Sequence, residues 1–367
     1  MAEHPSLQGN IGTPDLDGIC TLDAFEALAE NRLMRAAEVI LNQGAGTSAG
    51  VRRNCSAWGQ WAINSRILVD IPDIQLGTTV LGTPVSLPVL FAPTALHGLA
   101  HPEGELATAR AAKRADTLMV LSFTSSLTLE QVAAHPTKLW FQIYWSKDRD
   151  YLRHMIDRAA ASGYQAICLT LDMPVKPWLG VQMRQAVRDT AGIVPAHGMA
   201  RNIFLDAAMP WLHDARLTWA DLAWLISICP LPLVLKGVMT ADDARLAVEH
   251  GASAIVVSNH GGRVLEDGLA TADVLPEIIA MVGGRIEVLV DGGIRRGSDV
   301  FKALAMGARA VLIGRPVQWG LAVAGSHGAQ RVIEILGGEM ASVMGMAGAR
   351  TVGDITRGKI ARRVNFP

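Results

Sequence analysis

The stretch Ile286-Glu-Val-Leu-Val-Asp-Gly-Gly293 decides the fold, because an apolar run too short for a helix ends in a polar, glycine-rich turn. Seven further runs of this kind occur, and a helical pattern follows each of them. The eight runs are 89–95, 117–123, 139–144, 166–173, 231–238, 254–260, 286–293 and 310–316. Runs that are apolar almost throughout are typical of parallel strands buried on both faces.

Eight strand–helix units in one chain predict an α/β TIM barrel. The alternative is an open, doubly wound sheet, which would carry a GxGxxG turn after its first strand. Here the first run ends Ala92-Pro-Thr-Ala95 instead. The barrel is therefore favoured, and we expect one domain over 22–367 behind a flexible N-terminal tail, 1–21.

Two segments fall outside the repeating units. Before the first strand, the chain predicts two helices and a hairpin-like piece from Ile74 to Val85 that closes the bottom of the barrel. Between the fourth and fifth strands, about 175–216 forms a long insertion that contains Trp178 and Trp211. Long loops in compact domains are commonly lids or binding loops, so we expect an apolar lid here.

The composition excludes several classes of protein. The 367 residues include 33 basic and 34 acidic side chains, so no basic excess indicates a nucleic-acid or anionic-membrane partner. No uncharged stretch approaches the roughly 20 residues of a membrane helix, and the first ten residues lack a signal-peptide pattern. The four cysteines lie far apart, which fits a reducing cytoplasm better than a disulfide framework or a zinc site.

Polar residues follow every expected strand, at the rim where barrel enzymes carry their active sites. Hydroxyl and amide groups at the first four strands suit a flat heteroaromatic ring, whereas glycines and arginines after the last two suit a phosphate. A large polar ligand explains the set better than packing does. The residues are Thr94, Ser122, Gln142, Tyr144, Thr170, Asp172, Lys236, Ser258 to Arg263, Asp291 to Arg295, Gly314 and Arg315.

Three of these side chains suggest catalysis. His260, three residues before Arg263, suits a general base beside a carboxylate-binding group, and Asp172 is placed to orient it. Lys236 is either a Schiff-base nucleophile or a fixed positive charge beside an anion. No His, Asp and Glu set with metal-ligand spacing gathers at the rim, so no metal site is predicted.

Several motifs together resemble the FMN-dependent 2-hydroxy-acid oxidases and dehydrogenases, over about residues 22 to 358. They are Ser258-Asn-His-Gly-Gly-Arg263, Leu289-Val-Asp-Gly-Gly-Ile-Arg-Arg296, Ile313-Gly-Arg-Pro316, Leu235-Lys-Gly-Val238 and Ala100-His-Pro-Glu-Gly-Glu105. The resemblance implies an FMN cofactor, a small-molecule substrate, dioxygen or another electron acceptor, and a homo-oligomer, a tetramer in this family.

The resemblance also implies roles for single residues. His260 would be the base, Asp172 its partner, Arg263 the ligand of the substrate carboxylate and Tyr144 the ligand of the substrate hydroxyl. Lys236 would lie beside flavin N1 and the C2 carbonyl. Other flavin contacts would come from Pro93, Thr94, Ala95, Ser122, Gln142, Thr170 and Ser258, and ribityl and phosphate contacts from Asp291, Gly292, Gly293, Arg295, Gly314 and Arg315.

Two positions depart from the family pattern. Ile40 stands where the family usually has a tyrosine that binds the substrate carboxylate. Leu179, or Gln182 if a gap is allowed, stands where the family has an arginine with the same task, and Arg184 or Arg188 could replace it. We therefore expect a substrate bulkier and more apolar than lactate. Alternatives are oxidation of an amine or alcohol in a specialised biosynthetic pathway, or a Schiff-base aldolase that uses Lys236.

Overall fold

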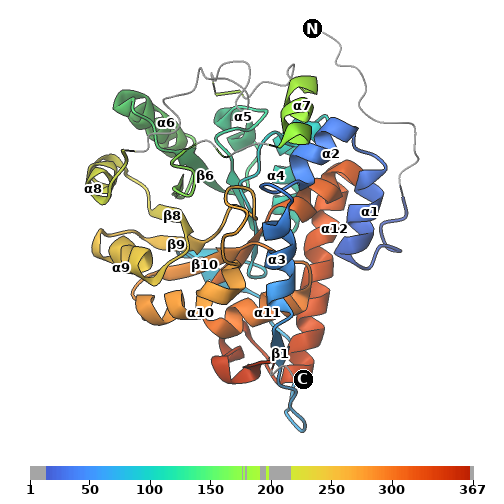
Figure 1. Ribbon diagram of the computed structural model, residues 1–367. Coiled ribbons are helices and arrows are strands. Elements are labelled where there is room, and N and C mark those ends of the chain that lie inside the picture. The colour runs from blue at the N-terminus through green and yellow to red at the C-terminus, as the bar shows by residue number, and fades with distance from the viewer. Residues whose placement is uncertain (1–13, 176, 178–179, 191–195, 198–215, 364–367) are drawn as a thin grey trace.

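The computed structural model confirms the TIM barrel (Figure 1). It describes residues 14–175, 177, 180–190, 196–197 and 216–363. Eight parallel strands close in the order β10-β11-β4-β5-β6-β7-β8-β9. Each falls within one of the expected runs except β6, which begins one residue earlier. They are β4 (Val89–Phe91), β5 (Leu118–Leu121), β6 (Lys138–Tyr144), β7 (Ile167–Thr170), β8 (Leu233–Val238), β9 (Ala254–Val257), β10 (Glu287–Asp291) and β11 (Ala310–Ile313).

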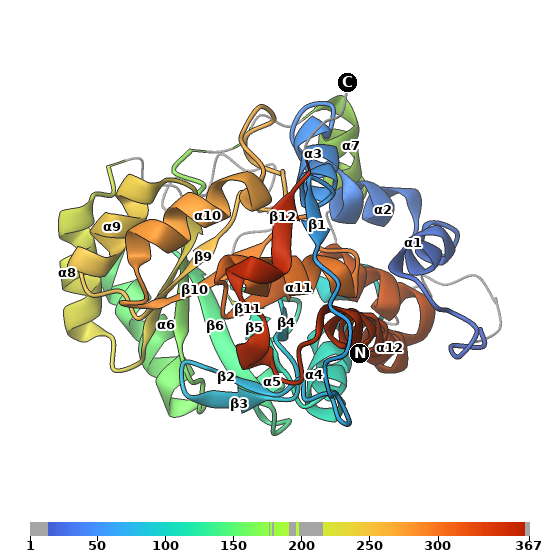
Figure 2. The ribbon, with the colours of Figure 1, turned by 90° about the horizontal axis from the view of Figure 1, so that it is seen from below.

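Helices follow the strands along the chain and surround the barrel (Figures 1 and 2). Their side of the sheet is as apolar as the interior, which is why the strand sequences do not alternate. The helices are α4 (Gly104–Arg114), α5 (Leu129–Ala133), α6 (Arg149–Ala161), α7 (Val181–Asp189), α8 (Trp219–Ile228), α9 (Ala241–Glu249), α10 (Thr271–Val282), α11 (Gly297–Met306) and α12 (Arg315–Ala347).

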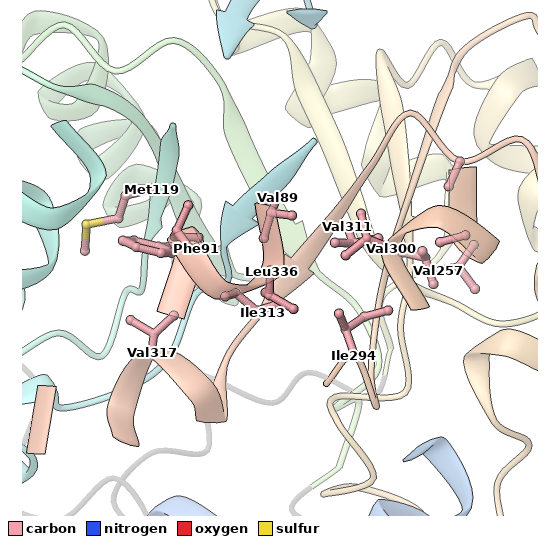
Figure 3. Packing of buried hydrophobic residues seen from close by; sticks show 14 of the residues in the cluster. Val89, Phe91, Met119, Val257, Ile294, Val300, Val311, Ile313, Val317 and Leu336 are labelled. Carbon is pink, nitrogen blue, oxygen red and sulfur yellow. The ribbon is translucent and has the colours of Figure 1, made fainter. Parts of the chain in front are cut away.

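Successive strand residues point to opposite sides of the sheet and enter two separate apolar clusters. Leu90 and Val120 belong to the cluster inside the barrel. Phe91 and Met119 belong to the outer cluster, where Leu336 of α12 also packs (Figure 3). Apolar burial contributes about 25 cal/mol per Å², so both layers hold the strands in register and fix the rim.

The segment before β4 contains three helices, so the expectation of two is wrong in number. They are α1 (Leu22–Glu30), α2 (Arg35–Asn42) and α3 (Ala49–Trp58). The third lacks an apolar stripe because it contacts the loop after β9 through Gly50 and the buried Asn54. The expected hairpin is present as β2 (Thr78–Val80) and β3 (Thr83–Val85). Its Val80 and Val85 join the cluster inside the barrel, beneath the strands (Figure 2).

The chain ends of the described region are held to the barrel. Ile19, 6% exposed, packs in the outer cluster. The Thr21 hydroxyl caps α1 by accepting from the backbone N–H of Ala24 at 3.3 Å. Near the other end, β12 (Ile360–Arg362) pairs with β1 (Trp61–Ile63) in an antiparallel ladder (Figure 2). Residues 1–13 of the expected tail lie outside the described region.

The described part of the insertion contains α7, which the sequence analysis did not predict as a helix. This helix lies beside α2 above the strands (Figure 1). Ile40 of α2 and Met183 and Val187 of α7 share one apolar cluster. The contact brings an N-terminal helix and the insertion together over the same rim. Trp178, Leu179 and Trp211 lie outside the described residues.

The long helix α12 is interrupted at Ala324 and Gly325, whose backbone angles are not helical. The two helical parts meet at Gly320 and Gly328. A Cβ added at Gly328 would lie 2.0 Å from the Gly320 carbonyl oxygen. Since both partners are backbone, the contact cannot relax by a side-chain rotation.

We predict that Gly328→Ala destabilises the protein by roughly 1–3 kcal/mol, the usual cost of overpacking. Gly338→Ala is the matched control, because that helical glycine is exposed and a Cβ there meets nothing within 4 Å. The control should stabilise the protein by about 0.5–1 kcal/mol through helix propensity. Urea unfolding of both variants tests this, and equal midpoints would contradict the close contact at Gly328.

Candidate active site

A cavity of about 220 Å³ opens at the C-terminal ends of the strands. Its wall includes most of the residues expected from the sequence. Those residues are Pro93, Thr94, Ala95, Ser122, Tyr144, Lys236, His260, Arg263, Asp291, Gly292, Gly293, Arg295, Gly314 and Arg315. Asp172, Gln142, Thr170 and Ser258 are not among the lining residues, but each contacts one that is, or contacts its neighbour.

His260 and Asp172 meet as expected, with 2.9 Å between His260 Nδ1 and Asp172 Oδ1. Burial raises the pKa of Asp172, but His260 and the Lys236 ammonium outweigh burial and hold that pKa below its usual value. Asp172 is therefore ionised and accepts a hydrogen bond from the Nδ1–H group of His260. This arrangement leaves Nε2 of His260 as the nitrogen available for proton transfer.

The backbone at His260 is left-handed, with φ of 56°, an uncommon conformation for a residue other than glycine. Neighbouring contacts hold it. The backbone N–H of His260 donates to Ser258 Oγ at 3.1 Å. The side chains of Asn259 and Asn54 exchange two hydrogen bonds of 2.8 Å, which tie this loop to α3. Strained residues held in this way are common at active sites.

Lys236 is 4% exposed and lies at the rim end of β8. Its Nζ lies 3.2 Å from Asp291 Oδ2 and donates to Ser258 Oγ at 2.8 Å. Burial alone would lower the pKa of Lys236, but Asp291 and Asp172 outweigh burial and raise it above its usual value. The lysine is thus a fixed positive charge. A Schiff-base aldolase needs an unprotonated lysine, so the aldolase alternative is not favoured.

Gln142 links two other expected ring-binding positions, Ser122 and Thr170. Its Oε1 accepts from Ser122 Oγ at 3.2 Å and from the backbone N–H of Phe123 at 3.1 Å. Its Nε2 donates to Thr170 Oγ1 at 3.0 Å. The three side chains therefore form one connected network, of which Ser122 reaches the cavity wall.

Tyr144 lies on the cavity wall with its ring edge-on to Phe123, 6.4 Å between centroids. Burial first, and then the Asp172 carboxylate, raise the pKa of Tyr144 to about 12. The phenol therefore stays protonated at any ordinary pH and serves as a hydrogen-bond donor.

Three arginines, Arg263, Arg295 and Arg315, line the cavity and lie close enough for their charges to interact. Arg315 donates to the carbonyls of Gly261 and Asn42 at 3.0 and 3.2 Å, and the Arg295 guanidinium stacks on Trp319 at 4.7 Å. Burial and the charges of Arg263 and Arg295 lower the pKa of Arg315 to about 9. Half-buried like charges are unfavourable unless an anion compensates them, so the part of the cavity around Arg295 and Arg315 suits a phosphate.

A glycine beside these arginines lets the chain pass close to α3. Gly293 has a φ of 79°, and a Cβ there would lie 2.1 Å from the Asn54 carbonyl oxygen. Two buried oxygens near the cavity, Asp291 Oδ1 and Gln318 Oε1, have no hydrogen-bond partner among the described residues. Cations, glycines on the cavity wall and unused acceptors together fit a phosphate-bearing polyol such as the ribityl chain of FMN.

Sequence reasoning missed several wall and supporting residues. Thr124, Met183 and Gln318 line the cavity, and Asn54 supports the His260 loop. His97 lies behind Thr94, although the sequence offered no reason to single it out. Among the described residues, no cluster of three or more His, Cys, Asp or Glu side chains could hold a metal ion. None of the described helices is long and apolar enough to span a bilayer.

Comparisons with known proteins agree with this geometry. Residues 29–362 match the family model for FMN-dependent dehydrogenases. The chain is 46% identical over 351 residues to the L-lactate oxidase of a Nostoc species, covering 90% of this chain and 95% of that protein. It is 39% identical over 353 residues to the glycolate oxidase of Spinacia oleracea, covering 94% and 96% of the two chains.

Solved structures with the same fold include a mandelate oxidase with (S)-2-phenylpropionate, with a TM-score of 0.84 and 38% identity over 95% of this chain and all of that one. A soluble mutant of the (S)-mandelate dehydrogenase from Pseudomonas putida matches with a TM-score of 0.86 and 32% identity. The match covers 94% of this chain and all of that one. The chain therefore belongs to the FMN-dependent 2-hydroxy-acid oxidases and dehydrogenases, and it is an oxidoreductase with FMN as its cofactor.

Proposed function

We propose that this enzyme oxidises a 2-hydroxy acid whose substituent is larger and more apolar than the methyl group of lactate. The observation that carries the proposal is the position of Ile40, which is 4% exposed and lines the cavity. An isoleucine cannot offer a hydrogen bond to a carboxylate, and it gives an apolar surface to a ring or an alkyl chain.

The wall around Ile40 is apolar as well. Leu41, Met173, Met183 and Val264 line the same cavity. At about 25 cal/mol per Å², burying a phenyl ring against such a wall offsets a missing polar contact. Met side chains also adapt their shape to aromatic groups.

The residues considered in place of the family's arginine include Gln182, Arg184 and Arg188, all on α7. Gln182 pairs with Gln43, at 2.6 Å between Nε2 of Gln43 and Oε1 of Gln182. Arg184 and Arg188 lie on α7, and neither is among the described residues that line the cavity.

Arg263 remains as a carboxylate ligand beside His260. Its guanidinium donates to the carbonyls of Ile40, Leu41 and Gln43 at 2.8 to 3.2 Å. These contacts use three of its five N–H groups, so two remain for a substrate. The same carbonyls end α2, where the helix dipole stabilises a positive charge.

His260 and Tyr144 supply the proton chemistry. With Nδ1 held by Asp172, Nε2 of His260 accepts the proton that the substrate loses, and Asp172 stabilises the resulting imidazolium. Tyr144 donates to the substrate hydroxyl and orients it. Bound FMN supplies the acceptor for the two electrons. Lys236 provides a fixed positive charge that stabilises the negative charge developing beside it.

The FMN phosphate is assigned to Arg315 and Arg295 together with the backbone N–H groups of Gly293 and Gly314. This assignment is supported by the interacting charges of the arginines and by the position of both glycines on the cavity wall. Dioxygen or another electron acceptor completes the reaction. The cytoplasmic location and the homo-oligomeric state stay predictions from the sequence.

A second candidate substrate is L-lactate, since one relative with 46% identity is named an L-lactate oxidase. The mandelate oxidase and mandelate dehydrogenase structures favour the aromatic candidate. Ile40 offers an apolar contact to an aromatic substrate but no hydrogen bond to the carboxylate of lactate. Variants of Ile40 therefore distinguish the two candidates.

We predict a higher kcat/KM for (S)-mandelate than for L-lactate at the same pH, because Ile40 replaces a polar carboxylate ligand by an apolar contact. Steady-state kinetics with both acids measures the ratio. A ratio at or below one would overturn the apolar-substrate proposal and leave the family assignment untouched.

Ile40→Tyr and Ile40→Phe form a matched pair of variants. Both add an aromatic ring, but only the first adds a hydroxyl. One hydrogen bond to a charged group contributes about 1.5–3 kcal/mol. We therefore expect Ile40→Tyr to raise kcat/KM for L-lactate by roughly 10-fold or more over Ile40→Phe. Equal values for the two variants would contradict the idea that a carboxylate ligand is missing at residue 40.

His260→Asn should retain FMN and lose substrate oxidation. A general base contributes typically 10²–10⁴-fold, so the rate of anaerobic flavin bleaching is expected to fall by about that factor. The flavin absorbance of the purified variant serves as the control for cofactor content. Bleaching at the native rate would remove His260 from the mechanism.

Arg315→Ala should weaken FMN binding about 10- to 100-fold, the effect of losing charge-assisted hydrogen bonds. Arg362→Ala is the control, since that arginine is exposed on β12 at the far end of the barrel. Titration of FMN into each apoprotein, followed by flavin fluorescence, measures both affinities. Equal affinities would place the phosphate elsewhere.

A further inference from the structure

His97 is a buried histidine that the reaction scheme above does not use. It is 2% exposed and lies in a short 3-10 turn (His97–Leu99) just after β4. Its Nε2 lies 2.7 Å from Oγ1 of Thr94, a residue of the cavity wall. Its Nδ1 lies 2.7 Å from Oγ1 of Thr108 on α4. One imidazole therefore joins a wall hydroxyl to a hydroxyl of the outer helix.

The backbone of His97 is fixed as firmly as its ring. Glu105, a fully buried carboxylate, accepts from the backbone N–H of His97 at 3.0 Å and from that of Ser126 at 2.9 Å. The ring consequently has little freedom to leave Thr94. Burial lowers the pKa of His97, although the Glu105 charge opposes this effect. The ring is therefore neutral and carries one proton, so one nitrogen donates and the other accepts.

Thr108 decides which nitrogen carries the proton. Its hydroxyl is fully buried, and within the described part of the chain it has no other hydrogen-bond partner than His97 Nδ1. A buried hydroxyl proton is almost always used. Thr108 therefore donates to Nδ1, and the imidazole proton lies on Nε2, from where it is donated to Thr94 Oγ1.

Thr94 then accepts a second time. Gln318 Nε2 donates to the same Oγ1 at 2.8 Å. A hydroxyl oxygen has two acceptor positions and one proton. With both acceptor positions filled by His97 and Gln318, the Thr94 proton points away from these two groups and is left for an acceptor in the cavity.

We propose that His97 is a positioning residue that turns the Thr94 hydroxyl into an obligate hydrogen-bond donor to the bound flavin. A threonine hydroxyl left to itself would choose between donating and accepting. The carbonyl oxygens and unprotonated ring nitrogens of a flavin accept hydrogen bonds, so an obligate donor favours them. The relay Thr108–His97–Thr94 thereby extends the cofactor site to a helix outside the barrel.

The tautomer is the first test, and it requires no variant enzyme. Neutron diffraction from deuterated crystals of the FMN-bound enzyme locates the deuteron on His97 directly. We expect it on Nε2, with a deuteron on Thr94 Oγ1 directed at the flavin. A deuteron on Nδ1, on both nitrogens, or a Thr94 hydroxyl directed at His97 would overturn the proposal.

Variants of Thr108 provide the second test. Thr108→Val keeps the shape and removes the donor to Nδ1, whereas Thr108→Ser keeps the hydroxyl. We expect Thr108→Val to weaken FMN binding by about 3- to 10-fold, the effect of one hydrogen bond, and to lower the flavin reduction potential. The serine variant should restore both values to near those of the wild type.

A double-mutant cycle separates this role from a packing role. In a Thr94→Val background, the relay has no hydroxyl to orient. Thr108→Val should then leave the FMN dissociation constant within about 2-fold and the reduction potential unchanged. If the two substitutions act additively on both quantities, Thr108 acts through packing and the relay is refuted.

Discussion

The buried positions of Asp172 and Asp291 at the cavity depend on one positive charge, the ammonium of Lys236. It is buried at the end of β8, and the carboxylates of Asp291 and Asp172 both raise its pKa. Burying either carboxylate without a cation would cost several kcal/mol. His260 and Lys236 in turn lower the pKa of Asp172. His260, Asp172, Lys236 and Asp291 are therefore one electrostatic unit, contributed by β8, the end of β10 and the loops after β7 and β9.

Much of this unit could be predicted from the sequence because the C-terminal ends of all strands in a parallel barrel lie at the same rim. A polar residue after a buried apolar run lies at the catalytic rim, whatever the rest of the chain does. This rule alone placed Lys236, Asp291 and His260 near one another. The Asp172–His260 pair followed for the same reason, although 88 residues separate its members.

Contacts between segments with no common periodicity could not be predicted. α3 has a glycine and an asparagine on its buried side, so its pattern does not identify a helix that packs in the interior. The hydrogen bonds from Arg263 to the end of α2 are made to backbone carbonyls, which leave no trace in the sequence. His97 was likewise invisible, since its partners Thr94 and Thr108 are ordinary hydroxyls until the fold brings them within 2.7 Å of the ring.

The gathering of Arg263, Arg295 and Arg315 has a consequence for how the protein acquires its cofactor. These like charges oppose one another in the apoprotein, and burial together with the two neighbouring arginines lowers the pKa of Arg315. An anion that binds only the folded chain stabilises it by RT ln(1 + [L]/Kd), about 2.7 kcal/mol at one hundred times Kd. Cofactor supply and folding are thus thermodynamically linked. When flavin is scarce, fewer molecules carry the cofactor. A larger fraction of the chains is also unfolded and exposed to proteolysis.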